Sequence, residues 1–574
     1  MPIHNSDVAQ IFNDIGDLLE IQGENQFRIR AYRTAAQTVS GLGENLSAKV
    51  EKGEDLSNIS GIGKDLADKI AIVLETGSLP MLDNLKRKTP GELITIMKIG
   101  GLGGKRVKKI YDELGTATLD QLKQAASAGK ISSLPGFGTK TEQSILEGIE
   151  QVKQGQGRRL WAEVEETVNA LVDYLHQARK VKKVTVAGSF RRRKETVHDI
   201  DVLATCSKGS NIMDHFTSFD EIDKVVSRGE TRSTVVMRSG LQADLRVVPQ
   251  VSYGAALHYF TGSKEHNIAI RKRGVKRGLT INEYGVFRKK DRVAGKTEQE
   301  VYAAVKLPYI EPELRENREE IETAEQSTLP ELIVQDDIRG DLHMHSVYTD
   351  GRESIESMVK AGRQRGYDYV AITDHSRHVT VANGLDVKRL RKEIEEIDSL
   401  NDSINGMHVL KGIELDILED GSLDLPDEVL KELDIAMCSI HYKFNLSQKQ
   451  QTERVIKAMD NRYFTALSHP TGRIINDRPP YEIDVNRILE AAAERGCFVE
   501  VNGQPDRLDL ADHYCRAASE RGVKCILSTD AHSAGNLDFM RHAVAQARRG
   551  WLQADDVVNT RTYTDLKKIL TQRR

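Results

Sequence analysis

Three aspartates in the first half of the chain have the spacing of a divalent-cation site. Asp199 and Asp201 are two residues apart in an apolar run, so in a β-strand their side chains point to the same face. Asp244 lies in a second apolar run that can pair alongside the first. Converging carboxylates repel one another unless cations neutralise them, and hard oxygen ligands favour Mg²⁺. We therefore expect two Mg²⁺ ions that activate an attacking hydroxyl and stabilise a departing pyrophosphate.

A Gly-Ser pair precedes these aspartates. Gly188 and Ser189 offer backbone amides and a hydroxyl to a triphosphate, and Arg192 can add a charge-assisted contact. An Asp-x-Asp pair by itself is commonly a solvated strand end. The combination of the pair with the upstream Gly-Ser turn is the specific signal.

Histidines and carboxylates gather in the second half of the chain, where seven apolar runs each end in polar residues. The runs are Gly340–Ser346, Val370–His375, Val409–Asp416, Ile435–His441, Phe464–His469, Cys497–Asn502 and Cys525–His532. Six of them deliver potential metal ligands. The ligands are His343, His345, Asp350, His375, Glu414, His441, His469, Asp530 and His532. A single buried histidine is more often a core residue, but this recurrence at strand ends indicates a multinuclear Zn²⁺ or Mn²⁺ cluster.

The elements between these runs must bring the ligands together. Helical patterns separate most of the runs, and repeated strand–helix units predict a parallel sheet, here a barrel. The carboxyl ends of barrel strands meet at one face, where the loops build an active site. Bound ions there would lower the pKa of a water and neutralise a departing oxygen, so the expected chemistry is phosphoester hydrolysis.

Three short segments near the start of the chain resemble one another: Ile59–Gly63, Ile99–Gly103 and Leu134–Gly138. Each has the pattern apolar-x-Gly-apolar-Gly between two helix-forming stretches. Glycines permit positive φ and close backbone approach, and open amides at the next helix favour a phosphate. One copy would be weak, but three copies resemble helix-hairpin-helix motifs, which bind a DNA backbone without reading sequence. The expected DNA contacts are Gly61, Gly63, Gly101, Gly103, Lys105, Gly136 and Gly138.

Residues 1–317 resemble the DNA polymerase X family. The resemblance rests on the Gly-Ser and Asp-x-Asp motifs, on Tyr259-Phe-Thr-Gly-Ser263 and on Leu279-Thr-Ile-Asn-Glu-Tyr284. It implies that Asp199, Asp201 and Asp244 are the catalytic metal ligands. It also implies a template contact by Arg271 and a nucleotide site formed by Gly188, Ser189, Arg192, Tyr259, Phe260, Gly262 and Asn267. Paired aromatics such as Tyr259 and Phe260 are more often core residues, but the adjoining glycine favours the family role.

The N-terminal residues also resemble the lyase domain of that family, through Arg28, Tyr32 and Lys69. A lysine with a lowered pKa can form a Schiff base with a 5′-deoxyribose phosphate. However, Asp65 replaces the lysine that the family has four residues before Lys69, which should weaken 5′-phosphate binding. A second departure is Gln242, where animal members have an arginine beside the third aspartate.

Residues 340–550 resemble the polymerase and histidinol phosphatase (PHP) superfamily. The resemblance rests on Asp-Leu-His-Met-His-Ser, Thr-Asp-His, Gly-Ile-Glu, Ser-Ile-His, Ser-His-Pro and Ser-Thr-Asp-Ala-His. All nine ligand positions are filled. The resemblance implies Mn²⁺-dependent 3′→5′ exonuclease activity, with apurinic endonuclease or 3′-end-cleaning activity in some members. Arg377, Lys443 and Arg473 are weaker candidates for phosphate contacts.

Composition agrees with a large soluble protein. The chain has 574 residues, 39% of them hydrophobic and 29% charged, and a net charge of −4. The balance carries no global signature of nucleic-acid binding, although basic clusters lie at Arg191–Lys194 and Arg271–Arg273. The five cysteines lack metal or disulfide spacing, and neither a signal sequence nor a membrane span is expected. These features predict a cytoplasmic protein.

The sequence predicts a multidomain α+β and α/β fold. We expect helical helix-hairpin-helix domains, a nucleotidyltransferase palm with a small α+β nucleotide-binding domain, and a C-terminal PHP domain that forms a distorted (βα)7 barrel. The predicted ranges are 1–88 for a lyase-like domain, 89–156 for a DNA-binding domain, 157–254 for the palm, 255–317 for the nucleotide-binding domain, 318–338 for a linker and 339–574 for the PHP domain. The charged stretch Glu311–Glu331 is expected to be an exposed helix or linker.

These features predict a monomeric DNA polymerase that fills short gaps in DNA repair and trims 3′ ends. Its expected partners are gapped or nicked double-stranded DNA and deoxynucleoside triphosphates, with Mg²⁺ in the palm and Zn²⁺ or Mn²⁺ in the PHP domain. One alternative is a PHP phosphoesterase or nuclease whose N-terminal half only binds DNA. A small-molecule phosphatase and a non-enzymatic DNA-end scaffold are further alternatives.

Overall fold

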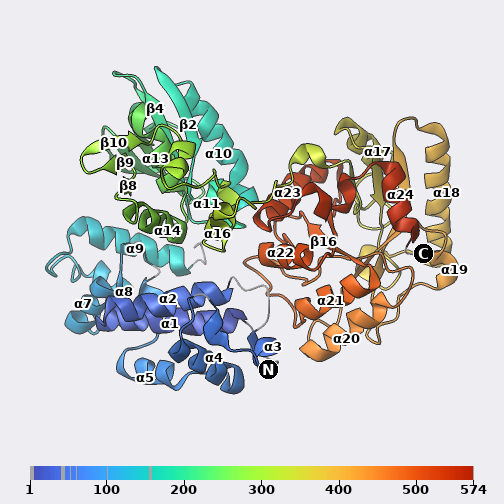
Figure 1. The fold of residues 1–574 in the computed structure, drawn as a ribbon, viewed down its shortest axis with the longest axis horizontal. Helices are drawn as coiled ribbons and strands as arrows, with labels where there is room; N and C mark the ends of the chain where they lie inside the picture. Colours follow the sequence, from blue (N-terminus) through green and yellow to red (C-terminus); the bar gives the residue numbers. More distant parts are fainter. Residues whose placement is uncertain are drawn as a thin grey trace. The chain divides into compact units, whose positions relative to one another are not determined.

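The structure is a computed structural model that describes residues 5–40, 46–51, 53–59, 61–97, 99, 101–153 and 158–572. The chain divides into two compact units, residues 1–158 and residues 159–574. Each unit is described by itself below, and Figure 1 shows the elements of both.

The described part of the first unit is entirely helical. Its elements are α1 (Asn5–Gln22), α2 (Gln26–Ser40), α3 (Leu46–Glu51), η1 (Leu56–Asn58), α4 (Lys64–Thr76), α5 (Pro80–Lys88), α6 (Leu93–Met97), α7 (Gly104–Leu114), α8 (Leu119–Ser127) and α9 (Thr139–Lys153). Local signals explain several of the ends. Gly77 and Gly115 end α4 and α7 in the left-handed conformation, and Thr118 begins α8 with a capping box to Gln121. One continuous apolar core holds these helices together.

The second unit begins with a five-stranded sheet in the order β2-β4-β7-β6-β5. Its strands are β2 (Val181–Val186), β4 (Asp199–Cys206), β5 (Ile222–Arg228), β6 (Arg232–Met237) and β7 (Gln242–Val247). Strands β4 and β7 are parallel, and the other pairs are antiparallel. Helices α10 (Trp161–His176) and α12 (Ile212–Thr217) contribute to the apolar core of the sheet. The two apolar runs that carry Asp201 and Asp244 are the adjacent strands β4 and β7, as expected.

A smaller α+β region follows the sheet. It contains α13 (Tyr253–Thr261), α14 (Lys264–Val275), α15 (Glu298–Ala304) and an antiparallel sheet of β8 (Thr280–Asn282), β9 (Gly285–Arg288) and β10 (Asp291–Ala294). This arrangement agrees with the small α+β domain that the sequence predicts.

Of the two alternatives expected for the charged stretch Glu311–Glu331, the exposed helix was wrong, whereas the linker stays a prediction. Arg315 and Glu320 are fully buried. Arg315 Nη1 lies 2.6 Å from Glu298 Oε1, and Glu320 Oε1 lies 2.6 Å from His266 Nδ1. The stretch contains only η3 (Pro312–Leu314) and α16 (Glu320–Glu325), because its charged side chains serve as buried partners of the preceding region rather than as a solvated helix face.

The C-terminal half forms a parallel seven-stranded sheet in simple sequential order. The strands are β11 (Gly340–Asp341), β12 (Tyr369–Ile372), β13 (His408–Asp416), β14 (Ile435–Ser439), β15 (Ala466–Leu467), β16 (Phe498–Asn502) and β17 (Cys525–Ser528). Beyond the strand ends a parallel bridge between Met344 and Ala531 joins the first and last strands, so the barrel is nearly closed. The predicted seven-stranded parallel barrel is confirmed.

Helices surround this barrel and follow its strands along the chain, as Figure 1 shows for the yellow to red half of the molecule. They are α17 (Ile355–Gln364), α18 (Val387–Ser403), α19 (Asp427–Leu430), α20 (Gln448–Met459), α21 (Val485–Arg495), α22 (Asp512–Glu520), α23 (Met540–Arg549) and α24 (Tyr563–Gln572). Among the described residues, no helix combines the length and apolar character needed to cross a membrane.

Candidate functional site

The three glycine turns of the first unit have one geometry. In each, the amide after the first glycine donates to the carbonyl three residues earlier, at 3.0 Å: Ile62 to Ile59, Leu102 to Ile99 and Phe137 to Leu134. The glycine inside each turn has φ of +88° at Gly61, +82° at Gly101 and +88° at Gly136. A positive φ at the third position of a turn strongly favours glycine there. The structure therefore repeats one turn three times, as the sequence pattern predicts.

The helices that follow the first two turns begin with open amides. Gly63 and Gly103 cap α4 and α7 in extended conformation, and neither cap supplies a side-chain acceptor to the first-turn N–H groups. Lys105 is exposed in the first turn of α7. These open amides and the adjacent positive charge suit the phosphates of a DNA backbone.

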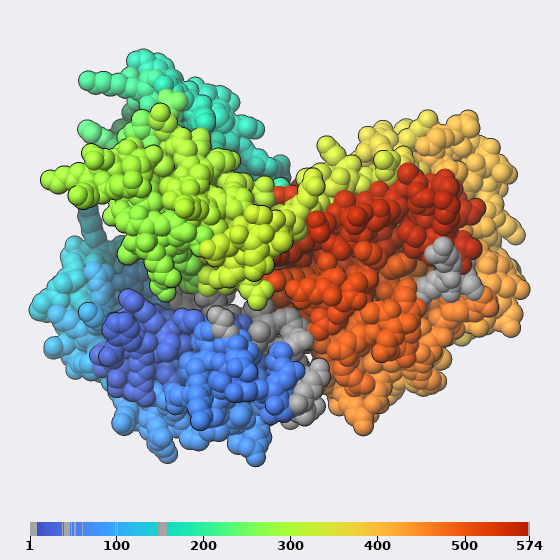
Figure 2. All heavy atoms as spheres, in the orientation of Figure 1, coloured from blue at the N-terminus to red at the C-terminus, as the bar shows by residue number. Residues whose placement is uncertain are grey.

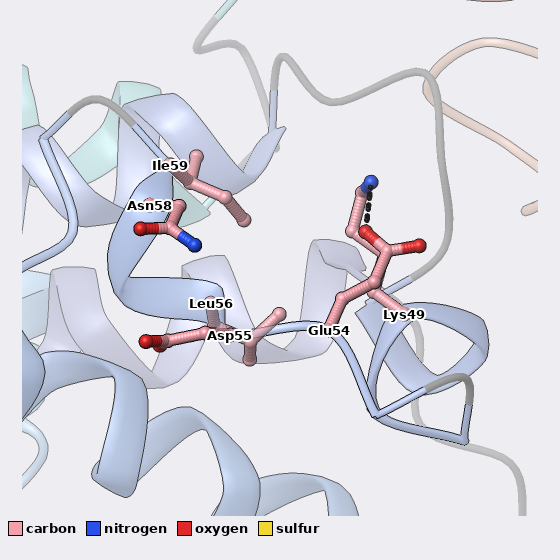
Figure 3. A pocket seen from close by; sticks show the side chains of 6 residues that line it. All are labelled: Lys49, Glu54, Asp55, Leu56, Asn58 and Ile59. Carbon is pink, nitrogen blue, oxygen red and sulfur yellow. Dashed lines mark hydrogen bonds and ion pairs between the residues drawn. The ribbon is translucent and has the colours of Figure 1, made fainter.

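Side chains tie the second hairpin to the third. Lys109 Nζ donates to the carbonyl of Pro135 at 2.6 Å, and the Arg106 guanidinium lies 5.7 Å from the centre of the Phe137 ring. A pocket of about 400 Å³ lies beside the first hairpin, at η1. Figure 3 shows its lining, in which Lys49 pairs with Glu54 at 2.9 Å. The contacts of Lys109 and Arg106 thus join the second and third hairpins into one connected surface.

Replacement of Gly136 by Val should weaken the binding of gapped duplex DNA about tenfold. No atom lies within 4 Å of a Cβ added at Gly136, but its φ of +88° disfavours a β-branched residue, so the turn must change shape. Gly129 is a matched control, because it has φ of +70° and equally open surroundings but lies outside the hairpins. Fluorescence anisotropy at two salt concentrations measures both variants. Equal weakening by Gly129→Val would contradict a role for the hairpin turn.

The lyase candidates lie together in the first unit. Lys69 Nζ is paired with Asp65 and lies 5.4 Å from the centre of the Tyr32 ring, and Arg28 lies 3.6 Å from Glu24. Burial alone would lower the pKa of Lys69, but its bonds to Asp65 and Tyr32 outweigh burial and raise that pKa. A Schiff-base lysine needs the opposite shift, so the lyase role stays a prediction without support from the structure.

The palm aspartates converge as the strand pattern predicts. Asp201 on β4 is paired in register with Asp244 on β7, and Asp199 points to the same face two residues earlier. Burial, together with the charges of Asp199 and Asp244, raises the pKa of Asp201 to about 6. Such mutual repulsion is what a cation site shows before its ions enter.

Gly188 lies directly against this acidic cluster. It has φ of +64°, and a Cβ built on it would lie 2.8 Å from Asp201 Oδ2. Both facts require glycine at this position. Gly188 begins the short helix α11 (Gly188–Arg191) within contact distance of the aspartates.

Asp244 is held from both sides. Its Oδ1 accepts from Arg232 Nη2 at 3.1 Å and from Thr234 Oγ1, and its Oδ2 accepts from Gln242 Nε2 at 3.0 Å. Gln242, which departs from the family pattern, is thus a direct partner of the third aspartate. Arg232 is a contact that the sequence motifs did not indicate.

The nucleotide-site candidates surround the same turn. Arg192 donates to the carbonyl of Thr261 and lies 3.1 Å from a Cβ built on Gly262. Asn267 Nδ2 donates to the carbonyl of Tyr259 at 2.7 Å, whereas its buried Oδ1 has no partner. The side chains of Phe260 and Tyr259 are partly buried and stack with Arg246 at 4.5 Å and Arg271 at 5.0 Å. The backbone carbonyl of Ser189 accepts from the amide of Lys194 at 3.1 Å.

The nine ligand candidates of the barrel form a second, separate cluster around Glu414. One of its oxygens lies 2.8 Å from His469 Nε2 and 3.2 Å from His441 Nε2. The other lies 2.8 Å from His375 Nδ1 and 3.6 Å from both His343 Nε2 and His345 Nε2. Glu414 therefore lies at the centre of the cluster, and its two oxygens face different imidazoles.

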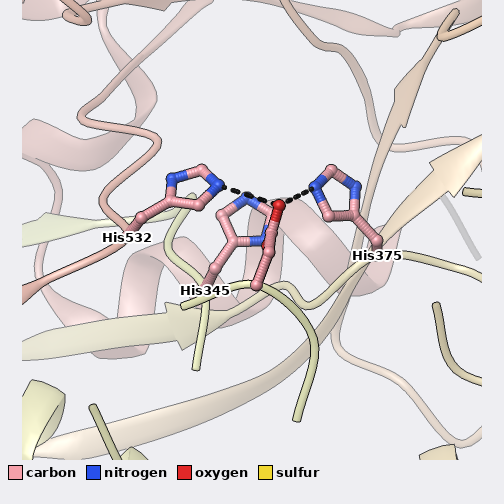
Figure 4. Close-up of side chains that lie close together, drawn as sticks. His345, His375 and His532 are labelled. Carbon is pink, nitrogen blue, oxygen red and sulfur yellow. Dashed lines mark ion pairs between the residues drawn. The ribbon is translucent and has the colours of Figure 1, made fainter. Parts of the chain in front are cut away.

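Asp350 and Asp530 complete the cluster. Asp350 Oδ2 lies 3.4 Å from His375 Nε2 and 3.5 Å from His532 Nε2, and Figure 4 shows these imidazoles converging with His345. Asp530 Oδ1 lies 3.1 Å from His345 Nε2. Three overlapping groups have ligand atoms close enough to share an ion: His345, Asp350, His375 and His532; His343, His345 and Asp530; and His375, Glu414 and His441.

The donor set fits transition-metal ions. Among the described residues, His343 Nε2 and His345 Nδ1 are buried without a hydrogen-bond partner, which is costly unless an ion binds them. Burial first, and then the neighbouring His375, lowers the pKa of His345 to about 3. Burial would also lower the pKa of His375, but Glu414 and Asp350 outweigh it and raise that pKa to about 10, so an entering ion must displace a proton there. Imidazole and carboxylate ligands together suit Zn²⁺ or Mn²⁺.

Comparison with known proteins covers the same regions. Residues 3–79 match a helix-hairpin-helix domain, residues 92–151 a SAM-like helix-hairpin-helix tandem, residues 159–254 the DNA polymerase beta palm, residues 256–316 the DNA polymerase beta thumb and residues 341–504 the PHP domain. The DNA polymerase/3′-5′ exonuclease PolX of Bacillus subtilis (strain 168) is 37% identical over 99% of both chains. The chain belongs to the PolX family. These are family X DNA polymerases that carry a C-terminal PHP domain.

Other relatives of this PolX-family chain match only part of it. A protein of Thermoanaerobacter sp. (strain X514) named probable phosphatase is 28% identical over 38% of this chain and 89% of its own length. Another, from Caldanaerobacter subterraneus subsp. tengcongensis, is 32% identical over 33% of this chain and 75% of its own length. Part of the chain is therefore similar to separate proteins as well as to a PolX enzyme.

Sequence reasoning missed Glu500 in the PolX barrel. Glu500 is fully buried on β16, the one strand run to which no ligand was assigned. Its Oε1 lies 2.6 Å from His343 Nδ1, and its Oε2 accepts from the amide of His469 at 2.5 Å. The available signal was a carboxylate inside the apolar run Cys497–Asn502, where an unpaired charge is too costly to bury. Glu500 orients one ligand and anchors the backbone of another.

Replacement of Glu500 by Gln should weaken metal binding by the barrel about 10- to 100-fold, because the partner of a ligating histidine sets the orientation and basicity of its ring. Isothermal titration with Mn²⁺ measures the change. Glu494→Gln is the control, because Glu494 is an exposed residue on the neighbouring helix α21. Unchanged Mn²⁺ affinity in a folded Glu500→Gln protein would contradict the role of Glu500 in orienting His343.

All three weaker phosphate candidates already have partners, and Lys443 Nζ lies 3.4 Å from Glu419 Oε2. Arg473 donates to Glu195 of the palm at 2.5 Å and to the carbonyl of Arg507 at 2.9 Å, and its side chain is only 14% exposed. Arg377 is 57% exposed and donates to Asp424 at 3.2 Å. Arg473 thus connects the barrel to the palm and is not placed to meet a substrate, whereas Arg377 and Lys443 remain exposed.

Proposed function

We propose that the chain is a DNA polymerase that fills short gaps in DNA and also shortens 3′ ends with its barrel. The carrying observation is that one chain contains two complete and separate acidic sites, the aspartates of β4 and β7 and the cluster around Glu414. The full-length similarity to a protein named DNA polymerase/3′-5′ exonuclease supports this pairing of activities.

In the proposed palm reaction, Asp199, Asp201 and Asp244 hold two Mg²⁺ ions. Bound there, the ions activate the 3′ hydroxyl and neutralise the leaving pyrophosphate. Gly188 and Ser189 supply amide and hydroxyl donors to the triphosphate, and Arg192 supplies a positive charge. Asn267 offers its unpartnered Oδ1 to the incoming base, Tyr259, Phe260 and Gly262 pack against the sugar, and Arg271 contacts the template strand.

In the proposed barrel reaction, the nine ligands hold Zn²⁺ or Mn²⁺ ions: His343, His345, Asp350, His375, Glu414, His441, His469, Asp530 and His532. Such ions lower the pKa of a bound water and polarise a phosphodiester. Glu414 holds adjacent ligands at a fixed separation, and Asp350, which is 36% exposed, lies at the open side where a 3′ end can enter. Apurinic endonuclease activity is part of the same proposal.

DNA binding in this proposal is electrostatic and largely independent of sequence. The hairpin glycines and Lys105 contact the backbone of gapped or nicked duplex DNA on either side of the gap. The affinity should therefore fall steeply with salt. We propose that the protein is cytoplasmic and acts as a monomer. Light scattering of the DNA-free protein tests the monomeric state.

An alternative function for the barrel is that of a phosphatase, because part of the chain resembles proteins named probable phosphatase. Assays with a small phosphomonoester and with a 3′-labelled duplex, at equal enzyme and Mn²⁺ concentrations, separate the two. We expect DNA shortening with little phosphomonoester turnover. Turnover of the phosphomonoester without any DNA shortening would favour the phosphatase.

A further inference from the structure

Helix α23 of the barrel lies against the palm segment that follows the Gly188–Ser189 turn. Gln546 Nε2 donates to Glu195 Oε1 at 2.8 Å, and Arg541 Nε donates to Glu165 Oε2 at 2.8 Å. Figure 2 shows the same neighbourhood, with the yellow-green atoms that precede the barrel against the red atoms of the C-terminal region. The interface therefore reaches the part of the palm that would bind a triphosphate.

Arg549, the last residue of α23, is the most buried cation of this interface. Only 4% of the residue is exposed. Its Nη1 donates to the carbonyl of Arg192 at 2.9 Å and to Glu316 Oε1 at 3.2 Å, and its Nη2 donates to Asp512 Oδ2 at 2.6 Å. A barrel residue thus fixes the backbone of a proposed triphosphate ligand.

Arg192 and Arg549 share one carboxylate oxygen. Glu316 Oε1 accepts from Arg192 Nε at 3.0 Å as well as from Arg549. Burial would raise the pKa of Glu316, but Lys194, Arg549 and Arg192 outweigh it and hold that pKa at about 2. Glu316 is therefore fully charged at neutral pH, and its charge is divided between two guanidinium groups.

We propose that Arg549 is a positioning residue for nucleotide addition, which makes Arg192 available to the incoming triphosphate by sharing the charge of Glu316. The inference rests on the proposed triphosphate contact of Arg192. A triphosphate must compete with Glu316 for the guanidinium of Arg192. Without Arg549, Glu316 is a buried carboxylate with fewer partners, so it holds Arg192 more tightly and the triphosphate binds less well. The barrel in this way contributes to the reaction of the palm without touching the nucleotide.

The test is single-nucleotide addition to a gapped duplex by the full-length Arg549→Met variant. We expect the KM for the deoxynucleoside triphosphate to rise about tenfold while kcat stays within about twofold, since one charge-assisted contact is weakened before chemistry. In a Glu316→Gln background the same Arg549→Met change should raise KM less than about twofold, because the competing charge is gone. This double-mutant cycle separates charge sharing from a merely structural contact.

Arg541→Met is the matched control. Arg541 lies on the same helix and at the same interface, but it pairs with Glu165, far along the chain from Arg192 and Glu316. It should leave KM unchanged, and both variants should keep dNTP-free shortening of 3′ ends. An unchanged KM in Arg549→Met would overturn the inference, and so would a KM increase that persists in the Glu316→Gln background. Joint loss of kcat, shortening and thermal midpoint would show a structural role only, and would also overturn it.

The failure of this inference differs from the failure of the proposed function. Wild-type protein that adds no nucleotide would refute the polymerase and the inference together. Wild-type protein that adds nucleotides, with an Arg549→Met variant that has the same KM, would refute the inference alone.

Discussion

Replacement of Asp201 by Asn should reduce templated nucleotide addition at least about a thousandfold. The variant loses a carboxylate at the centre of the proposed site for two Mg²⁺ ions. Stabilisation of charge by bound ions is worth several kcal/mol, and each 1.36 kcal/mol changes the rate by a factor of ten. Extension of a primer across a one-nucleotide gap measures the loss. Asp223→Asn is the control, because Asp223 is exposed on β5 of the same sheet.

The same variant should be at least as stable as the wild type when no divalent ion is present. Burial and two neighbouring carboxylates raise the pKa of Asp201 from 3.8 to about 6. The folded protein therefore binds more protons than the unfolded chain between these values, and its stability falls as the pH rises through about 6. Asparagine removes that cost. A large drop in the thermal midpoint of metal-free Asp201→Asn at pH 8 would contradict the account and make its lost activity uninformative.

Replacement of His343 by Asn should reduce dNTP-free shortening of 3′ ends at least about a thousandfold and leave templated addition within about twofold. His343 is fully buried, and its Nε2 faces Glu414 at 3.6 Å and Asp530 at 3.7 Å. Asparagine is too short to reach an ion held by those carboxylates. A gel assay with a 3′-terminal mismatch and Mn²⁺ measures the loss.

A second variant keeps this prediction informative if the buried change disturbs folding. Asp350→Asn alters a 36% exposed ligand of the same cluster and should also abolish shortening. His408→Asn is the control, because His408 lies at the opposite end of β13 from Glu414 and stacks on Tyr563. Full shortening activity in folded Asp350→Asn and His343→Asn proteins would exclude the barrel as the nuclease.

Much of the candidate sites was predictable, because local sequence rules place the residues. Successive side chains of a strand point to opposite faces, so Asp199 and Asp201 share one face. Parallel strands bring the residues at their carboxyl ends to one edge. Three repeated glycine turns identified the hairpins, since only glycine takes that φ without strain. These features depend on neighbours in the sequence, so they can be read without the fold.

Long-range ion pairs could not be predicted in this way. The cluster Arg191–Lys194 reads as a basic patch, but the structure pairs Arg191 with Glu298 at 2.6 Å and Arg192 with Glu316 at 3.0 Å. Each partner lies more than a hundred residues away, so no spacing rule connects them. Arg315 was misplaced as exposed for the same reason, because an arginine in a charged stretch is normally solvated.

The most direct test of two sites in one chain uses a single gapped duplex with a mismatched 3′ end. Wild-type protein should shorten the end without dNTPs and then fill the gap when dNTPs are added. Asp201→Asn should only shorten, His343→Asn should only extend matched ends, and a mixture of the two variants should restore repair of the mismatched end. Loss of shortening in a correctly folded Asp201→Asn protein, or failure of the mixture, would contradict two separate active sites.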